Sequence, residues 1–71
     1  MKAAKIRMKA FAAIRRNEWH AWIDTKTISG SREATASSAA SADIHIPGWA
    51  RDNPVVGIEE IVIETAGEVE V

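Results

Sequence analysis

The stretch SREATASSAASADIHIPGWARDNP, residues 31–54, decides the fold because it holds the clearest helix start and the clearest break in the chain. Ser29 and Ser31 are both suitable N-cap residues, since a serine hydroxyl accepts a hydrogen bond from an unpaired N–H of the first turn. Glu33 then falls in that turn, where the helix dipole favours a negative charge. Pro47-Gly48 indicates where the helix ends. The stretch therefore predicts one helix between two breaks.

Small side chains recur along this predicted helix at spacings near three and four residues. The stripe consists of Ala36, Ala39, Ala40 and Ala42. Alanines bury little area, so the helix needs a surface that approaches closely, such as a sheet. Ile44 and Ile46 are expected to be its larger anchors, and Trp49 is expected to close the end of a small core. We therefore expect this helix to dock on a sheet.

Residues 5–15 alternate between apolar and polar side chains, which is typical of a half-buried strand. A helix is the competing interpretation, because Ala, Lys, Arg and Met all favour helices. On a helical wheel, however, the large apolar residues scatter and Arg7 falls among them. The strand interpretation instead collects the apolar residues on one face, which then carries Ile6, Met8, Ala10, Ala12 and Ile14.

A second strand is expected at residues 19–28, joined to the first by a tight hairpin. Asparagine tolerates positive φ, so Arg16-Asn17 or Asn17-Glu18 suits a two-residue loop. The first loop pairs Ile14 with Trp19, and either loop brings the apolar faces of the two strands to the same side of the sheet. This agreement between pattern and turn supports the hairpin.

Residues 55–65, VVGIEEIVIET, are the third expected strand, with a bulge near Glu59-Glu60 where the apolar phase changes. The acidic tail, residues 66–71, either extends this strand or frays. A right-handed crossover from the second strand to the third puts the first strand in the middle, in the order 2-1-3. The prediction is an α+β fold, β-β-α-β, in which one helix packs on one face of a small three-stranded antiparallel sheet. Residues 1–71 then form a single domain.

Opposite charges are segregated along the chain, although its formal net charge is only −1. The basic residues of the first quarter are Lys2, Lys5, Arg7, Lys9, Arg15 and Arg16. The acidic residues of the last quarter are Glu59, Glu60, Glu64, Glu68 and Glu70. Such segregation is typical of a nucleic-acid-binding arm or an acidic tail, and also of neighbouring strands with complementary charges. We favour complementary strands, because the predicted sheet places the first strand beside the third.

Composition disfavours several classes of protein. With 71 residues and no cysteine, the chain has no disulfide and no zinc-finger spacing, and it favours a cytoplasmic setting. No apolar run approaches the ~18 residues of a membrane-spanning helix, and the run at residues 10–14 is too short for a signal peptide. We expect no contact with a membrane. A core of this size supplies little stability, so a homodimer is the default expectation.

Catalytic and metal-binding motifs are also missing from the sequence. It contains no G-x-x-x-x-G-K-[ST] loop and no G-x-G-x-x-G loop. Its serines cluster in the predicted helix, without the base and the orienting group of a hydrolase. His20 and His45 are the only histidines, and no third ligand accompanies Asp43 and His45 at a metal-binding spacing. We therefore expect no enzyme activity, no cofactor and no metal ion.

The sheet face that the predicted helix leaves uncovered is the candidate binding site. Its expected contact residues are Lys5, Arg7, Lys9, Phe11, His20, Trp22 and Lys26, with Arg15 and Asp24 on the same face. Two aromatic residues among cations can stack bases and hold phosphates. Alternatively, Phe11 and Trp22 form a cross-strand pair or a dimer contact. Exposed large apolar groups on such a face favour a macromolecular contact of some kind.

The architecture resembles that of small single-domain proteins encoded by phages and other mobile elements, some anti-CRISPR proteins of type I systems among them. The resemblance rests on the early strand KAAKIRMKAFAAIRR, the hairpin NEWHAWIDTKTI, the alanine-rich helix and the closing strand NPVVGIEEIVIE. It implies inhibition by binding a Cas protein or its surveillance complex, often where nucleic acid would otherwise lie. It assigns no role to single residues.

We therefore expect a non-enzymatic, cytoplasmic binding protein whose partner is a host protein or a ribonucleoprotein complex, inhibition of the anti-CRISPR type being the concrete version. A small nucleic-acid-binding protein that uses the same basic and aromatic face is the first alternative. A structural subunit that only associates with itself is the second.

Overall fold

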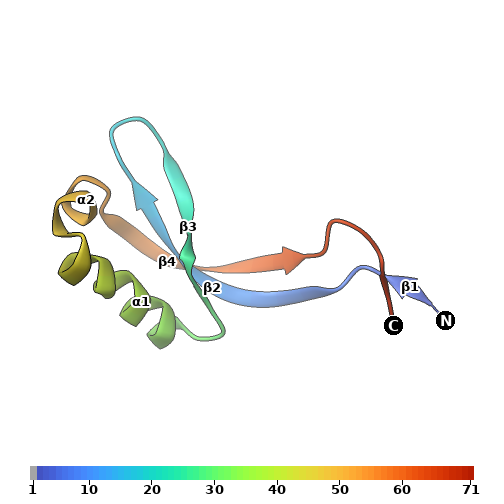
Figure 1. Cartoon of the computed structure of the whole chain (residues 1–71). Helices are drawn as coiled ribbons and strands as arrows, with labels where there is room; N and C mark the ends of the chain where they lie inside the picture. Colours follow the sequence, from blue (N-terminus) through green and yellow to red (C-terminus); the bar gives the residue numbers. More distant parts are fainter. Residues whose placement is uncertain (1) are drawn as a thin grey trace.

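A computed structural model describes residues 2–71 of the chain (Figure 1). Its elements, in chain order, are β1 (Ala3–Ala4), β2 (Arg7–Arg16), β3 (Ala21–Ser29), α1 (Arg32–His45), α2 (Pro47–Asp52), β4 (Val55–Glu64) and β5 (Val69–Glu70). β3, β2 and β4 form an antiparallel sheet with β2 in the middle, and β1 pairs with β5 in a second, two-stranded sheet. None of the helices described is long and apolar enough to cross a membrane.

The α+β class is confirmed, with a small antiparallel sheet, a helix on one of its faces, and the first long strand in its middle. The element order is richer than the predicted β-β-α-β. The acidic tail neither extends β4 nor frays, because Val69 and Glu70 pair with Ala4 and Ala3. Pro47 does not simply end the helix but begins α2 as its first residue, a position where proline's missing N–H is harmless.

The molecule has a body and a long arm, which Figure 1 shows extending away from the two helices. In the arm, β2 before Phe11 pairs only with β4, and the ribbon continues to β1 and β5. The radius of gyration is 14.9 Å, whereas a compact domain of this length is expected at about 11 Å. Much of the chain is therefore spread out as a thin ribbon.

The hairpin between β2 and β3 has a longer loop than predicted. Arg16 pairs with Ala21, so Ile14 lies opposite Ile23 instead of Trp19. Asn17 Oδ1 accepts hydrogen bonds from the N–H groups of the second and third residues after it, at 2.8 and 3.0 Å, which makes asparagine the turn-forming residue in a four-residue loop. Over residues 21–24 the shift is an even number of residues, so those side chains keep their predicted faces, whereas the bulge at residues 25–28 adds three residues and puts Ser29 on the face of Phe11. Trp19 leaves the strand and is 81% exposed.

α1 begins as predicted, because the Ser31 hydroxyl accepts a hydrogen bond from the Ala34 N–H at 3.2 Å. The side that it buries is different. Thr35 and Ala39 are its buried residues, whereas the other predicted stripe residues are exposed or half-buried. Ile44 and Ile46 are 76% and 47% exposed. The prediction that they anchor the helix on the sheet is therefore wrong.

α1 covers the opposite sheet face from the one predicted. The Arg15 Nη2 group donates to the Ala39 carbonyl at 3.4 Å, and the Arg32 guanidinium lies 5.0 Å from the centre of the Phe11 ring. Ser29, which is opposite Phe11 in the sheet, has its hydroxyl 2.8 Å from the Thr35 hydroxyl. The helix therefore packs on the face of Phe11 and Arg15, not on the face of Met8 and Ile14.

The physical reason lies in the composition of the interior. The buried apolar residues are Ala10, Ala12, Ala13, Ala39 and Ala50, and the buried polar ones are Arg15, Asp24, Thr27 and Thr35. Hydrogen bonds from Arg15, Arg32 and Thr35, rather than large apolar side chains, join α1 to the sheet, and the Arg15–Asp24 ion pair joins β2 to β3. The Thr35 hydroxyl lies 3.0 Å from the Phe11 carbonyl and 2.8 Å from the Thr27 carbonyl, and thus ties the helix to two strands.

The register of β4 on β2 is uninterrupted from Arg7–Glu64 to Ile14–Gly57. The predicted bulge near Glu59-Glu60 is therefore wrong. The pairing of β2 with β4 is interrupted instead between Ile14 and Arg15, where Val56 has no partner. The pairing of β2 with β3 is interrupted between Phe11 and Ala13. As a result, Ile58 faces α1, while Ile61 and Ile63 face away from it.

Candidate binding surfaces

The basic residues of the predicted site are paired within the sheet. Arg7 Nε donates to Glu64 Oε2 at 2.7 Å, and Lys5 Nζ lies 3.8 Å from Glu64 Oε1. Lys9 Nζ lies 3.6 Å from Glu60 Oε1. These pairs confirm the interpretation of neighbouring strands with complementary charges. They also leave less free positive charge for a phosphate backbone.

The two aromatic residues of the predicted site do not meet. Phe11 lies opposite Ser29, whereas Trp22 lies opposite Arg15, because the hairpin register is shifted. The expected Phe11–Trp22 pair is therefore wrong, and Phe11 packs beneath Arg32. The His20 ring does stay near Trp22, with 4.9 Å between their centres.

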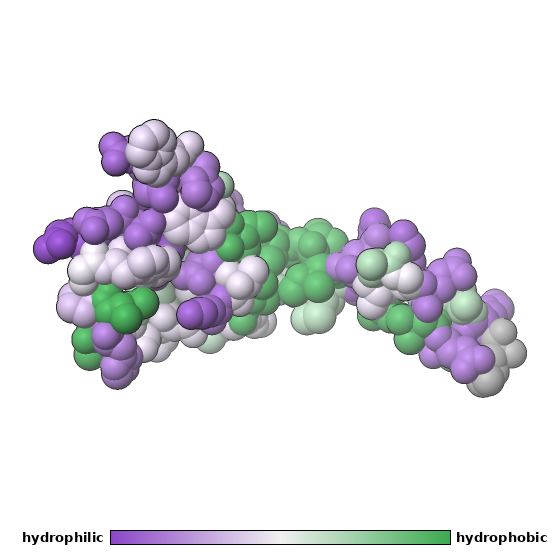
Figure 2. Space-filling model, turned by 45° about the horizontal axis from the view of Figure 1, so that its top comes forward, coloured by the Kyte–Doolittle hydropathy of each residue, from purple (hydrophilic) through white to green (hydrophobic). Residues whose placement is uncertain are grey.

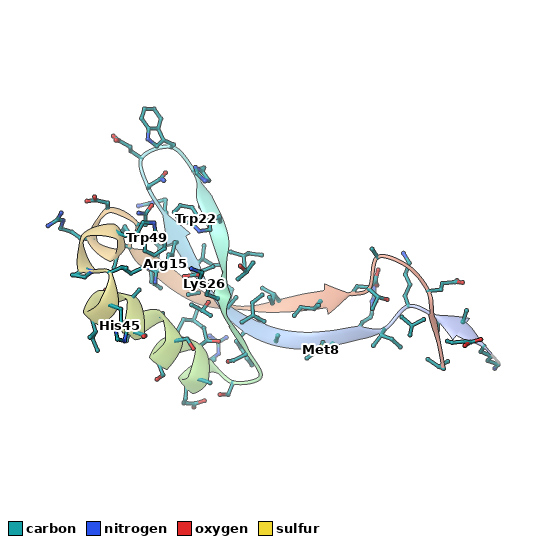
Figure 3. All side chains as sticks on the ribbon, in the orientation of Figure 1. Met8, Arg15, Trp22, Lys26, His45 and Trp49 are labelled. Atoms are coloured by element: carbon teal, nitrogen blue, oxygen red, sulfur yellow. The ribbon has the colours of Figure 1, made fainter. Side chains whose placement is uncertain are left out.

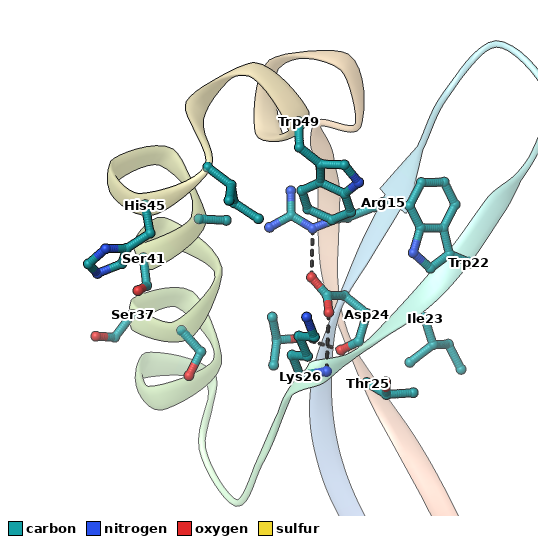
Figure 4. Close-up of a pocket in the computed structure, with 14 residues that line it drawn as sticks. Arg15, Trp22, Ile23, Asp24, Thr25, Lys26, Ser37, Ser41, His45 and Trp49 are labelled. Atoms are coloured by element: carbon teal, nitrogen blue, oxygen red, sulfur yellow. Dashed lines mark hydrogen bonds and ion pairs between the residues drawn. The ribbon is translucent and has the colours of Figure 1, made fainter.

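Trp22 and Lys26 instead line a groove between β3 and α1, which we call the α1–β3 groove (Figure 4). Its volume is about 960 Å³, at the upper end of the range of ligand pockets. The strand wall consists of residues 22–27 in unbroken succession. The helix wall carries Ser37, Ser38, Ser41, Ala42 and His45, and Ile46 and Trp49 lie at one end.

Arg15 forms the floor of the α1–β3 groove and is only 2% exposed. Its Nε donates to Asp24 Oδ2 at 2.6 Å, and its Nη1 donates to the Asn53 carbonyl at 2.8 Å. The Trp49 ring lies 4.8 Å from the guanidinium carbon, in a cation–π arrangement. Figure 4 shows this cluster between the strand and the helix. The floor is thus held by contacts from three parts of the chain.

The Asp24 carboxylate is fully engaged. Oδ2 accepts from Arg15, and Oδ1 accepts from the Lys26 backbone N–H at 3.1 Å. The Asp24 carbonyl accepts from the Thr27 hydroxyl at 2.7 Å. A carboxylate held in this way is not available as a general base for the nearby serines. Across residues 2–71, no group of three or more His, Cys, Asp or Glu side chains is placed to hold a metal ion.

β3 is an edge strand, since it pairs with β2 alone. Residues 22–24, which pair with β2, line the groove with their strand edge, whereas residues 25–28 form a bulge without partners on β2. In that bulge the Lys26 N–H and the Thr27 carbonyl are already hydrogen-bonded, to Asp24 and to Thr35. A free edge presents backbone N–H and C=O groups that another extended chain can pair with. The groove therefore combines unpaired strand backbone with two indole rings, those of Trp22 and Trp49.

A second surface lies on the other side of the three-stranded sheet. We call it the open sheet face; it consists of Met8, Ala10, Ala12, Ile14, Ile23, Ile61 and Ile63. Residues directly opposite one another share a face, and Ile23 points away from α1 in Figure 4. Met8, Ile23 and Ile63 are 56%, 45% and 37% exposed. Figure 2 shows hydrophobic side chains gathered where the arm leaves the body, and Figure 3 places Met8 on that arm.

Comparison with known proteins finds no matching family model, no similar curated protein and no similar solved structure. Roles for Trp22, Lys26 and the open sheet face are therefore argued from geometry alone. The sequence prediction missed Trp49 and His45 as groove residues, because neither lies on a predicted strand. It also missed Arg15, whose partners at Ala39 and Asn53 are distant in sequence.

Proposed function

We propose that this chain is a non-enzymatic protein-binding domain that holds an extended segment of another protein in the α1–β3 groove. The observation that carries the proposal is the edge of β3 at residues 22–24, which has no strand beyond it and lines the groove together with Trp49. Adding a strand to an exposed sheet edge is a common mode of peptide recognition, in which backbone hydrogen bonds supply affinity and side-chain pockets supply specificity. The small residues of the helix wall leave room for the added strand.

The groove favours a segment with an acidic and an apolar side chain. Arg15 neutralises Asp24, so Lys26 supplies the uncompensated charge on the strand wall. Tryptophan is enriched among the residues that dominate binding energy, because a large ring buries much area with little loss of rotamer freedom. Trp22 and Trp49 therefore provide the apolar contacts, and Lys26 attracts the acidic one.

Inhibition by docking on a host protein or ribonucleoprotein is the concrete version of this proposal. It is supported by the resemblance to small phage proteins, anti-CRISPR proteins among them, and the lack of cysteine favours a cytoplasmic setting. The nucleic-acid alternative has less support, because Lys5, Arg7 and Lys9 pair with glutamates on β4.

A selection from displayed random peptides tests the groove. Immobilised wild-type chain should enrich extended peptides with an acidic residue, and Trp22→Ala should lose at least about tenfold in affinity for them. Trp19→Ala is the matched control, because Trp19 is an exposed tryptophan in the hairpin loop, outside the groove. Amide shifts in NMR spectra should fall on residues 22–27 and on α1. Peptides that bind Trp22→Ala as well as wild type would overturn the groove assignment.

Capture from nuclease-treated bacterial lysate tests the inhibitor version. A host protein retained by wild type and Trp19→Ala, but lost with Trp22→Ala, would support it. Capture that depends on intact nucleic acid would instead favour the nucleic-acid alternative. That alternative also requires affinity that falls log-linearly with added salt.

A further inference from the structure

The open sheet face is apolar, and its larger residues are exposed or half-buried, although Ala10 and Ala12 between them are buried. Its larger residues are Met8, Ile14, Ile23, Ile61 and Ile63, whereas the buried apolar residues among residues 2–71 are all alanines. Burial of apolar area is the main favourable term in folding. Because its buried apolar residues are alanines and several isoleucines are exposed, a single copy gains little free energy of folding from apolar burial.

The arm also leaves apolar side chains without a packing partner. Its ribbon, formed by β2 before Phe11 and by β4 from Ile61 onwards, pairs with no third strand among residues 2–71 and extends away from the two helices. An isolated two-stranded ribbon is marginal in water and needs a hydrophobic face packed against something. Met8 and Ile63, which lie opposite each other on this ribbon, form such a face. Something must therefore cover the arm as well as the body.

We propose that a second copy of this chain covers the open sheet face, so that two copies pack sheet against sheet in a homodimer. The proposal goes beyond the protein-binding function of the α1–β3 groove and does not rest on it, because α1 and Trp22 lie on the other side of the sheet and Ile23 is the one residue named in both surfaces. A two-fold contact is self-complementary. It would bury both open sheet faces and both arms in one step.

We choose a second copy as the partner because the open sheet face needs to be covered while the chain folds. Because the chain buries so little by itself, the cover contributes to folding, and another copy is the partner present wherever the chain is made. Charge opposes the contact at one position only. Among residues 57–63, the β4 segment that pairs with residues 8–14, only Glu59 places a charge on this face, level with Ala12 at the side of an otherwise apolar stripe.

The size of the face fits a small dimer interface if the arm takes part. β2 has 10 residues, so the face is ~34 Å long, ~14 Å wide where three strands lie side by side and ~10 Å wide on the two-stranded arm. Its projected area is roughly 400–500 Å², and side-chain relief enlarges the accessible area towards the ~600 Å² per partner of the smaller stable interfaces. The body alone would be too small. Met8 and Ile63 on the arm should therefore matter as much as Ile23 on the body.

Sedimentation equilibrium of the full chain tests the proposal with a matched pair of variants. Met8→Glu should raise the dimer dissociation constant at least about tenfold. Val62→Glu should leave it unchanged, because Val62 is equally exposed on the arm, at 62%, but lies on its other face opposite Lys9. The melting temperature of wild type should rise with protein concentration, as expected for a dimer that folds on association. Equal effects of the two substitutions would overturn the proposal.

Cysteine cross-linking keeps the test valid if Met8→Glu fails to fold. The natural chain has no cysteine, so a single introduced thiol reports on one position. Three samples are oxidised at low micromolar concentration: Ile23→Cys alone, Met8→Cys alone, and the two variants mixed. At least one of them should form a covalent dimer, while Val62→Cys stays monomeric. A wild-type chain that is monomeric at about 100 µM, or cysteine variants that cross-link equally from all three positions, would overturn the dimer. Peptide binding lost in Trp22→Ala would still support the groove, so the two proposals fail separately.

Discussion

Arg15 Nε and Asp24 Oδ2 are 2.6 Å apart in the centre of the body, and their side chains are only 2% and 11% exposed. This ion pair occupies the place where most small domains put leucine or isoleucine. Removing charges from water costs free energy that a buried pair only partly recovers, whereas breaking the pair leaves one charge uncompensated. The pair therefore makes the body sensitive to the loss of either residue.

Asp24→Ala should be strongly destabilising. It leaves the Arg15 guanidinium buried beside Trp49 without its counter-charge, and such losses cost about 3–5 kcal/mol in free energy of unfolding. Because a domain of this size has little stability in reserve, the variant should be largely unfolded at low protein concentration. Urea denaturation followed by circular dichroism measures the effect.

The matched control for this prediction is Asp52→Ala. Asp52 Oδ1 lies 3.5 Å from Arg51 Nε, but the two side chains are 72% and 79% exposed. Solvent screens such a pair, so its loss should cost less than about 1 kcal/mol. The double substitution Arg15→Met with Asp24→Ala should recover part of the stability lost in Asp24→Ala. Similar costs for Asp24→Ala and Asp52→Ala would contradict the buried-pair interpretation.

Thr35→Val should destabilise the contact between α1 and the sheet. The two side chains have similar shapes, but valine lacks the hydroxyl that lies within hydrogen-bonding distance of the Phe11 and Thr27 carbonyls. Leaving a buried polar group without its partner costs about 1–3 kcal/mol. Thr25→Val, at an exposed strand position, should be neutral or slightly stabilising. An urea midpoint that is unchanged in Thr35→Val would show that these hydrogen bonds are not needed.

The features that the sequence predicted correctly either are local or depend only on the alternation of side chains between the two faces of a strand. Ser31 as N-cap and Asn17 as turn residue act on neighbours within three residues. Alternation correctly groups Ile14 with Ile23 and Arg15 with Trp22, because the register there is shifted by an even number of residues, which preserves the face of each side chain. Pairing of basic and acidic strands also followed from adjacency.

Which face the helix would cover could not be derived from alternation. Apolar periodicity shows which residues share a face, and the usual inference is that the apolar face is the covered one. Here Arg15 supplies a buried anchor whose partners come from Asp24, Ala39 and Asn53, and these contacts form only after the fold brings them together. Lys26 and Trp22, which were predicted to lie on an open sheet face, therefore line a groove instead.

Ser31→Ala should shorten α1 at its beginning. The Ser31 hydroxyl accepts from the Ala34 N–H at 3.2 Å, and loss of an N-cap typically costs ~1 kcal/mol. Ser37→Ala is a control inside the same helix, where alanine is the better helix former, so it should be neutral or stabilising. Circular dichroism and the urea midpoint measure both variants. Equal midpoints for the two would rule out a capping role for Ser31.

Glu64→Gln should loosen the arm without unfolding the body. The carboxylate of Glu64 bridges Lys5 and Arg7, at 3.8 and 2.7 Å, but these side chains are more than half exposed, so the pairs are worth less than about 1 kcal/mol together. Amide hydrogen exchange should therefore speed up near Ile6 and Thr65, whose backbones are hydrogen-bonded to each other, and stay unchanged at Thr27. The difference from wild type should shrink in ~1 M salt, where charges are screened beyond ~3 Å. Faster exchange throughout the body would show instead that the arm and the body unfold as one unit.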